Sequence, residues 1–119
     1  PSNAEGKNNN AIIPITNSDW KESESRRFSY SHTLVLEGIK SYFINQRKCS
    51  GFPTGEYSQQ YRCKGAILGI STGGTDVYNI EFKKVDDNIT DIRIRVDGIE
   101  NNEKMFKAIL DHIKYLASK

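Results

Sequence analysis

The feature of this sequence that most constrains its fold is a pair of neighbouring runs, residues 77–84 and 89–96, in which apolar and polar residues alternate. A period of two is typical of a β-strand with one covered face and one solvated face. Residues opposite each other in an antiparallel pair share a face, so even-numbered residues must meet even-numbered residues. The runs therefore predict a hairpin whose covered face carries Tyr78, Ile80, Phe82, Ile92, Ile94 and Val96.

Charge selects the register of this hairpin. A three-residue loop over residues 86–88 keeps the apolar faces together. Lys83 then faces Asp91, and in the same register Glu81 faces Arg93, on the side of the sheet away from the helices. A shift by two residues would set Lys83 against Arg93, and like charges directly opposite are destabilising.

A third strand is expected before the hairpin, at about residues 61–71. The glycines that follow favour a three-residue loop over residues 72–74, with Gly74 at a positive φ. Asn88 is expected to take the same left-handed conformation in the next loop. A bulge or strand end is expected near Gly65. The loop at residues 72–74 places on the covered face Ala66, Leu68 and Ile70, together with Arg62 and Lys64.

An amphipathic helix is predicted ahead of these strands. Ser29 or Ser31 can cap it, and it runs to about Arg47. Gly38 lies inside it, which costs about 1 kcal/mol relative to Ala but permits a close backbone contact. The apolar stripe of this helix consists of Leu34, Val35, Ile39, Tyr42 and Phe43.

A second helix is predicted at the C-terminal end. Asn101 or Asn102 can cap it, and it reaches about Ala117. Glu103 in the first turn and Lys114 in the last turn match the helix dipole. Its stripe is expected to interleave with the apolar side chains of the strands, and it consists of Phe106, Ile109, Leu110, Ile113 and Leu116.

The expected fold class is α+β: a two-layer sandwich of an N-terminal helix, a three-stranded antiparallel meander and a C-terminal helix, with both helices on one sheet face. A chain of 119 residues forms one domain, which we place at residues 28–119. Residues 1–4 look like the remnant of an expression tag. The polar residues 5–27 are interpreted as a tether. Within them, residues 11–15 are interrupted by Pro14 and are expected to form an edge strand or to lie over the core.

The two cysteines, Cys49 and Cys63, are expected to form a disulfide. Native sequence begins near Glu5 without a Met, so we expect that a signal peptide or lipid-attachment segment precedes it. Cysteines in exported proteins usually pair. A cross-link closing a loop of this length stabilises a fold by about 3 kcal/mol in the chain-entropy model.

Composition and motifs exclude several kinds of site. Seventeen basic against fifteen acidic residues leave a net charge of +2 that is not gathered into a stripe, so no nucleic-acid partner is expected. Apolar runs are too short to span a bilayer, so membrane contact is expected only through a removed N-terminal anchor. His32 and His112 lack the close ligand spacing of a zinc site, and we expect no metal and no cofactor.

No recognisable set of nucleophile, base and orienting group is present, so no catalytic residues are assigned and the protein is not expected to be an enzyme. Residues 71–75 have the composition of a phosphate-binding loop, but a strand rather than a helix follows them, which favours a hairpin turn.

A surface for a partner is the remaining kind of site. Phe52, Tyr57 and Tyr61 are aromatic residues of the loop between the cysteines, expected outside the core, that either form a binding patch or cover the core. The charged side chains of the open sheet face could bind an anionic partner, or they could simply form ion pairs with each other across the strands. The candidate partner surface therefore comprises Phe52, Tyr57, Asn79, Glu81, Arg93 and Arg95.

Residues 90–98 read Thr-Asp-Ile-Arg-Ile-Arg-Val-Asp-Gly, and an amphipathic helix follows them. In this the chain resembles a family of small bacterial envelope lipoproteins of unknown function, whose last strand carries Thr-x-Ile-x-Ile-Arg-x-x-Gly. The resemblance implies a helix–meander–helix fold and an extracytoplasmic, lipid-anchored, non-enzymatic protein. It brings no catalytic residues with it.

The leading functional expectation is an interaction or structural module of the bacterial envelope, in the periplasm or at the outer membrane. Its partner would be an envelope protein or a cell-wall component, and the protein would be a monomer or a weak dimer through the open sheet face. The alternative is a periplasmic small-ligand-binding protein with a pocket between the helices and the sheet.

Overall fold

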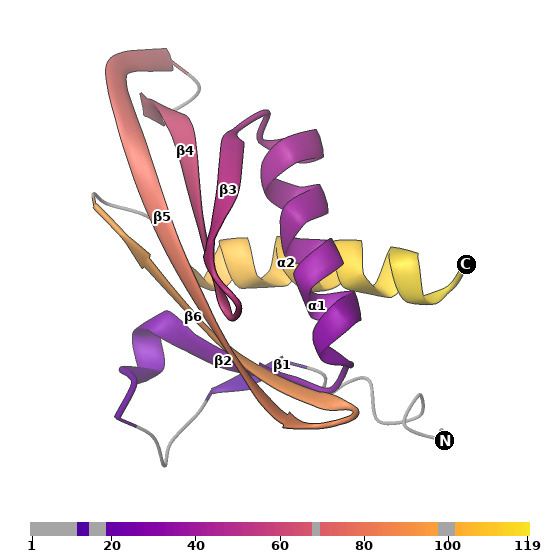
Figure 1. Cartoon of the computed structure of the whole chain (residues 1–119). Coiled ribbons are helices and arrows are strands. Elements are labelled where there is room, and N and C mark those ends of the chain that lie inside the picture. Colours follow the sequence, from indigo (N-terminus) through magenta and orange to yellow (C-terminus); the bar gives the residue numbers. More distant parts are fainter. Residues whose placement is uncertain (1–11, 15–18, 68–69, 98–101) are drawn as a thin grey trace.

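The fold is α+β, with one antiparallel sheet and two main helices (Figure 1). The computed structural model describes residues 12–14, 19–67, 70–97 and 102–119. Within these residues six strands pair in the order β1-β2-β6-β5-β4-β3. The strands are β1 (Ile12–Pro14), β2 (Ser25–Phe28), β3 (Ser50–Gly55), β4 (Ser58–Ile67), β5 (Ile70–Asp86) and β6 (Ile89–Val96), and a short helical turn, η2 (Glu22–Glu24), precedes β2.

The predicted register of the central hairpin is confirmed. Lys83 pairs with Asp91, and Glu81 pairs with Arg93, between β5 and β6. The connection differs from the expected loop, because β5 continues to Asp86 and a bulge lies between Lys84 and Asp86. The Asp86 carboxylate accepts the amide hydrogen of the second turn residue at 2.7 Å.

That second turn residue, Asn88, does not have the positive φ expected of it. Among the described residues only Lys48 and Gly73 have one. The carboxylate of Asp86 and the bulge before it close the turn, so a left-handed residue is not required.

The hairpin between β4 and β5 turns earlier in the chain than predicted. Ile67 pairs with Ile70, so residues 72–74 lie inside β5 rather than in a loop, and the positive φ belongs to Gly73 instead of Gly74. The bulge expected near Gly65 is confirmed by a register shift between Lys64 and Ala66.

The earlier turn reverses the predicted faces of β4. Arg62 and Lys64 are exposed, while Tyr61 and Cys63 point into the core. Ile70, expected inside, is 72% exposed. Leu68 and the side chain of Ala66 lie outside what the structure describes.

The sheet is twice as wide as the expected meander, because three further strands flank it. β3 extends the meander beyond β4, and β1 is the edge strand that Pro14 predicted. The tether expected at residues 5–27 extends too far along the chain, because β2 at Ser25–Phe28 pairs with β6. Phe28 is fully buried, so this segment belongs to the folded domain.

Ser31 caps the first helix, α1 (His32–Lys40), by accepting the amide hydrogen of Leu34 at 3.3 Å. The helix continues as a π-helical segment, η3 (Ser41–Gln46), and so ends close to the predicted Arg47. The second helix, α2 (Asn102–Ala117), ends at the predicted residue.

The two helices cross at Gly38, which makes the close contact expected of it (Figure 1). A Cβ atom built on Gly38 would lie 2.3 Å from Cγ1 of Ile113 and 3.3 Å from its Cα. The absence of a side chain at Gly38 therefore sets how closely α1 approaches α2.

The core lies between the helices and the even-numbered face of β5 and β6. Phe43 of η3 lies 5.1 Å from Tyr78, measured between ring centroids, and the guanidinium of Arg26 in β2 lies 4.7 Å above the ring of Phe106 in α2. The residues predicted to interleave there are all buried: Tyr78, Ile80, Phe82, Ile92, Ile94, Phe106, Ile109, Leu110 and Ile113.

We predict that Gly38→Ala destabilises the fold by about 1–3 kcal/mol, because overpacking the helix crossing outweighs the higher helix propensity of Ala. Urea unfolding followed by circular dichroism measures the change. Thr33→Ala, at an exposed position of the same helix, is the control and should change the free energy of unfolding by less than about 0.5 kcal/mol. Equal stabilities of the two variants would contradict the packing role of Gly38.

Candidate functional site

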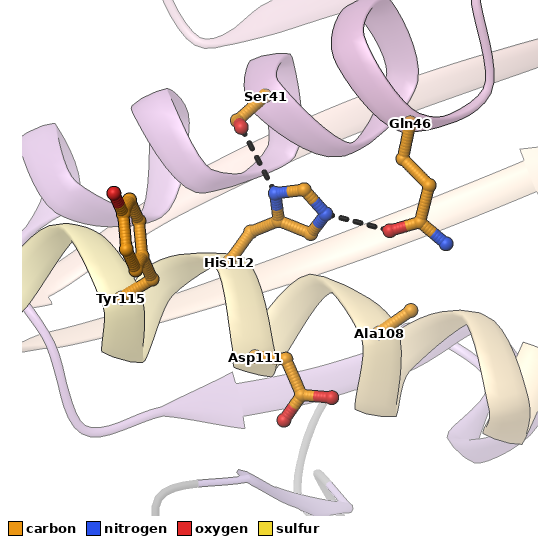
Figure 2. A pocket seen from close by; sticks show the side chains of 6 residues that line it. All are labelled: Ser41, Gln46, Ala108, Asp111, His112 and Tyr115. Carbon is orange, nitrogen blue, oxygen red and sulfur yellow. Dashed lines mark hydrogen bonds between the residues drawn. The ribbon is translucent and has the colours of Figure 1, made fainter.

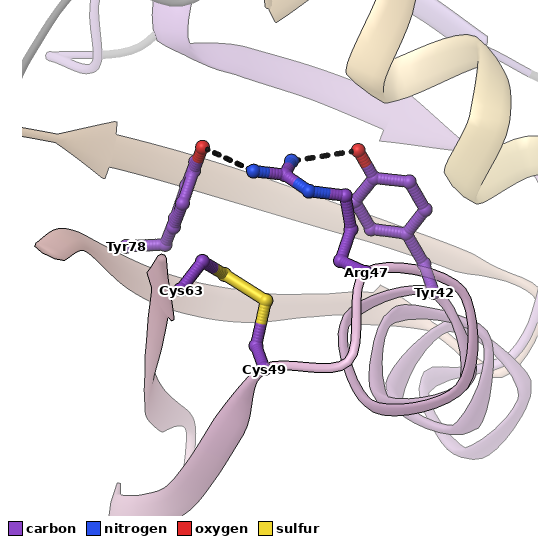
Figure 3. Close-up of a disulfide and its surroundings, with 5 residues drawn as sticks. All are labelled: Tyr42, Arg47, Cys49, Cys63 and Tyr78. Atoms are coloured by element: carbon purple, nitrogen blue, oxygen red, sulfur yellow. Dashed lines mark hydrogen bonds between the residues drawn. A yellow bond between two sulfur atoms is a disulfide. The ribbon is translucent and has the colours of Figure 1, made fainter. Parts of the chain in front are cut away.

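The disulfide between Cys49 and Cys63 is present and joins the start of β3 to β4 (Figure 3). The sulfur atoms are 2.00 Å apart and the two residues are 14 positions apart in the chain. Both cysteines are buried. A buried structural disulfide indicates an oxidising, extracytoplasmic environment.

Arg47 lies beside the disulfide and binds two tyrosines (Figure 3). Its guanidinium donates to the hydroxyl oxygens of Tyr42 and Tyr78, each at 3.0 Å. Burial lowers the pKa of Arg47, but the hydrogen bonds to Tyr42 and Tyr78 outweigh it and leave the pKa raised. Arg47 therefore stays charged and links η3 to β5, which is a structural role.

We predict that replacing both cysteines by serine lowers the free energy of unfolding by about 3 kcal/mol, since the closed loop no longer restricts the unfolded chain. Denaturant unfolding of oxidised, reduced and double-serine protein makes the comparison. Non-reducing mass spectrometry should show the oxidised protein two hydrogens lighter than the reduced one. Two freely alkylated thiols in folded, oxidised protein would contradict the cross-link.

Tyr61 is an aromatic residue of the inter-cysteine loop that covers the core. Its ring stacks on Phe43 with centroids 4.6 Å apart, and its hydroxyl donates to Gln59 Oε1 at 2.7 Å. Burial, with a smaller contribution from the charge of Glu37, raises the pKa of Tyr61 to about 12.

This shift predicts alkaline destabilisation. The unfolded chain loses the Tyr61 proton near pH 10, whereas the folded protein keeps it up to about pH 12, so the free energy of unfolding falls across that interval. Denaturant unfolding between those pH values measures the slope. Tyr61→Phe should flatten it, and Tyr115→Phe, at an exposed position, should not. A slope unchanged by Tyr61→Phe would contradict the assignment.

The predicted open sheet face carries a network of ion pairs at its β2 end. Arg93 donates through Nε to Glu81 Oε1 at 2.7 Å. Asp91 is only 4% exposed, and its carboxylate accepts two hydrogen bonds from the guanidinium of Arg27, at 2.8 and 3.1 Å. The bond to Asp91 raises the pKa of Arg27, although burial partly opposes it. The acids of this end are therefore neutralised within the fold.

Trp20 covers part of the same end, so this face is less open than predicted. Its ring lies 4.5 Å from the Lys83 ammonium and 5.1 Å from the guanidinium of Arg93. Arg93 and Glu81, two members of the candidate partner surface, thus pair with each other, and Arg93 also contacts Trp20 in the segment before β2.

Three other members of that surface lie on one row across the sheet. In the register of the sheet, Phe52 pairs with Gln60, Gln60 with Asn79, and Asn79 with Arg95, so one row crosses β3, β4, β5 and β6. The Gln60 amide donates to Asn79 Oδ1 at 2.9 Å. Phe52 is 49% exposed and Arg95 is exposed.

Basic side chains surround this row. Arg62 pairs in register with Val77, next to the row, and Lys64 follows on the same face of β4. Arg62, Lys64 and Arg95 are exposed and form no ion pair within the described part of the chain. Arg62 and Lys64 were not predicted as surface residues, because the register expected from the sequence placed both on the covered face of the sheet.

Tyr57, the remaining candidate, lies apart from this row. It occupies the turn between β3 and β4, and its ring meets the ring of His32 edge-on at a centroid distance of 5.1 Å. His32 in turn meets Phe82 at 5.7 Å. The structure therefore does not bring Tyr57 together with Phe52, Asn79 and Arg95.

A pocket of about 340 Å³ lies between η3 and α2 (Figure 2). His112 stands in its centre, with Nδ1 2.9 Å from Ser41 Oγ and Nε2 2.7 Å from Gln46 Oε1. Ser41 and His112 have the spacing of a nucleophile and its base, but the third partner is a neutral amide. Both imidazole nitrogens are engaged by the protein itself.

No cluster of three or more His, Cys, Asp or Glu residues that could hold a metal occurs in the described ranges. No helix in the same ranges is long and apolar enough to cross a bilayer. No protein-family model matches the chain, and no curated protein matches it.

Proposed function

We propose that the protein is an interaction module of the bacterial envelope that binds an acidic partner through the outer face of its sheet. The observation that carries the proposal is that the exposed side chains of Arg62, Lys64 and Arg95, near the exposed ring of Phe52, form no ion pair within the described residues. Exposed basic and aromatic side chains on a rigid sheet are typical of a recognition surface.

The paired charges in the neighbouring rows of the same face support the same assignment. Glu81 and Asp91 are already neutralised by arginines, so they do not repel an acidic partner. Burying Arg62 or Arg95 against a partner's carboxylate or phosphate would satisfy charges that the fold leaves in water. No catalytic step forms part of this proposal.

We propose further that the protein is held in the periplasm or at the outer membrane by an N-terminal lipid anchor. The disulfide supports an extracytoplasmic location, and the resemblance of residues 90–98 to small envelope lipoproteins supports the anchor. Expression of the full-length gene with labelled palmitate tests it: label on a cysteine before Glu5 is expected, and unlabelled secreted protein would refute it.

The alternative, a small-ligand-binding protein, is favoured by the pocket around His112, the largest of the described cavities. This pocket lies between η3 and α2, not between the helices and the sheet. Ser41 and Gln46 already hydrogen-bond to the two imidazole nitrogens of His112. A ligand that used these nitrogens would have to displace both side chains. We therefore favour the interaction module.

We predict that the purified protein co-sediments with envelope fractions and that salt weakens this binding. Arg95→Glu and Arg62→Glu should each weaken it about fivefold, with little effect on unfolding, because both side chains are exposed. Lys107→Glu, an exposed charge reversal on α2, is the matched control.

Protein-free cell-wall sacculi, used beside whole envelope fractions, distinguish a polymer from a protein partner. Binding that is insensitive to salt, or lowered equally by Lys107→Glu, would contradict recognition by the sheet face.

A further inference from the structure

The edge of the sheet at β3 is distinct from the outer face, with which it shares Phe52. Among the described strands, β3 is last in the sheet order and pairs only with β4. All six of its residues are exposed. A strand in this position presents unpaired backbone donors and acceptors, which an extended peptide can satisfy by adding a further strand.

A groove runs beside this edge, between β3 and the first helix. Its volume is about 180 Å³, room for a small number of side chains. Leu36, Lys40 and Ile44 form one wall at helical spacing, and Phe52 and Pro53 form the rim on β3. The ring of Tyr61 lies under Gly51, where a Cβ atom would approach it to 2.1 Å. The walls are mainly apolar, so side chains on one face of an added strand would be buried there.

Charge in the groove indicates the chemistry of the occupant. Lys40 lines it, is exposed, and forms no ion pair within the described part of the chain. Glu37, one turn earlier, acts electrostatically on Tyr61, a groove residue, and lines an adjoining pocket together with Lys40. Among the described residues that line the groove itself, Lys40 is the only charged one. An acidic side chain on the peptide would therefore be attracted at Lys40.

Two features favour a short peptide over a second copy of the chain. Pro53 has no amide hydrogen, so two β3 strands facing each other would both lack a donor. The disulfide at Cys49 fixes the start of β3, which holds the edge in place before binding.

We infer that β3 and the groove beside it bind an extended segment of a partner protein by strand addition. The segment places alternate aliphatic side chains in the groove and an acidic side chain at Lys40. This inference does not depend on the acidic partner proposed for the outer face, which uses Arg62 and Arg95.

A display library of random ten-residue peptides, selected on the disulfide-bonded protein, tests the inference. Enriched peptides should alternate aliphatic and polar residues and carry an acid. Amide hydrogen exchange should show protection in Ser50–Gly55 when a synthetic enriched peptide binds. Lys40→Glu should weaken that peptide about fivefold or more, while Lys107→Glu and Arg95→Glu leave its affinity unchanged.

Circular dichroism checks that each variant is folded. If a variant does not fold, the exchange experiment on the unmodified protein still tests the inference. The inference is overturned if selected peptides protect β6 or α2 instead of β3, if Lys40→Glu leaves their affinity unchanged, or if no peptide is enriched. Sedimentation showing a stable dimer of the free protein with β3 protected would assign the edge to a second copy. Loss of envelope binding in Arg95→Glu with retained peptide binding would separate the two sites.

Discussion

β5 and β6 each have a strand on both sides, and the position of every other strand follows from how these two pair. Their alternation gives the hairpin one apolar face and one charged face. β4 is added to β5, and β2 is added to β6, so a two-residue slip between the central strands would separate Glu81 from Arg93 and uncover part of the core. Packing on one face and ion pairing on the other therefore select the same arrangement.

The half of the molecule around η3 is held by several kinds of contact that reinforce each other. The π-helical segment carries Phe43 into the core, Arg47 joins two tyrosines, and Cys49 is bonded to β4 immediately afterwards. At the helix crossing, Gly38 lets α2 approach closely. These contacts make β3 and the groove part of a rigid frame, in keeping with a recognition edge formed before its partner arrives.

The central hairpin, both helices and the disulfide could be predicted because each depends on a local pattern: alternation, helical spacing and a cysteine pair. The strands β2 and β3 could not. β2 contains adjacent arginines, and it enters the sheet only because distant acids, Glu103 and Asp91, compensate their charge. β3 contains two glycines and a proline, which predict a loop, and it becomes a strand because β4 lies beside it.

The candidate site could likewise be predicted only in part. Phe52, Asn79 and Arg95 were expected on a surface and lie on one row, whereas Arg62 and Lys64 were missed because the turn before β5 was placed too late. The order of strands also separates the proposed anchor from the proposed recognition edge. β1 and β3 are the two outermost of the described strands, five strand spacings or roughly 24 Å apart across the sheet. With the proposed lipid anchor on the β1 side, the β3 edge would extend away from the membrane, where a partner could reach it without approaching the lipid.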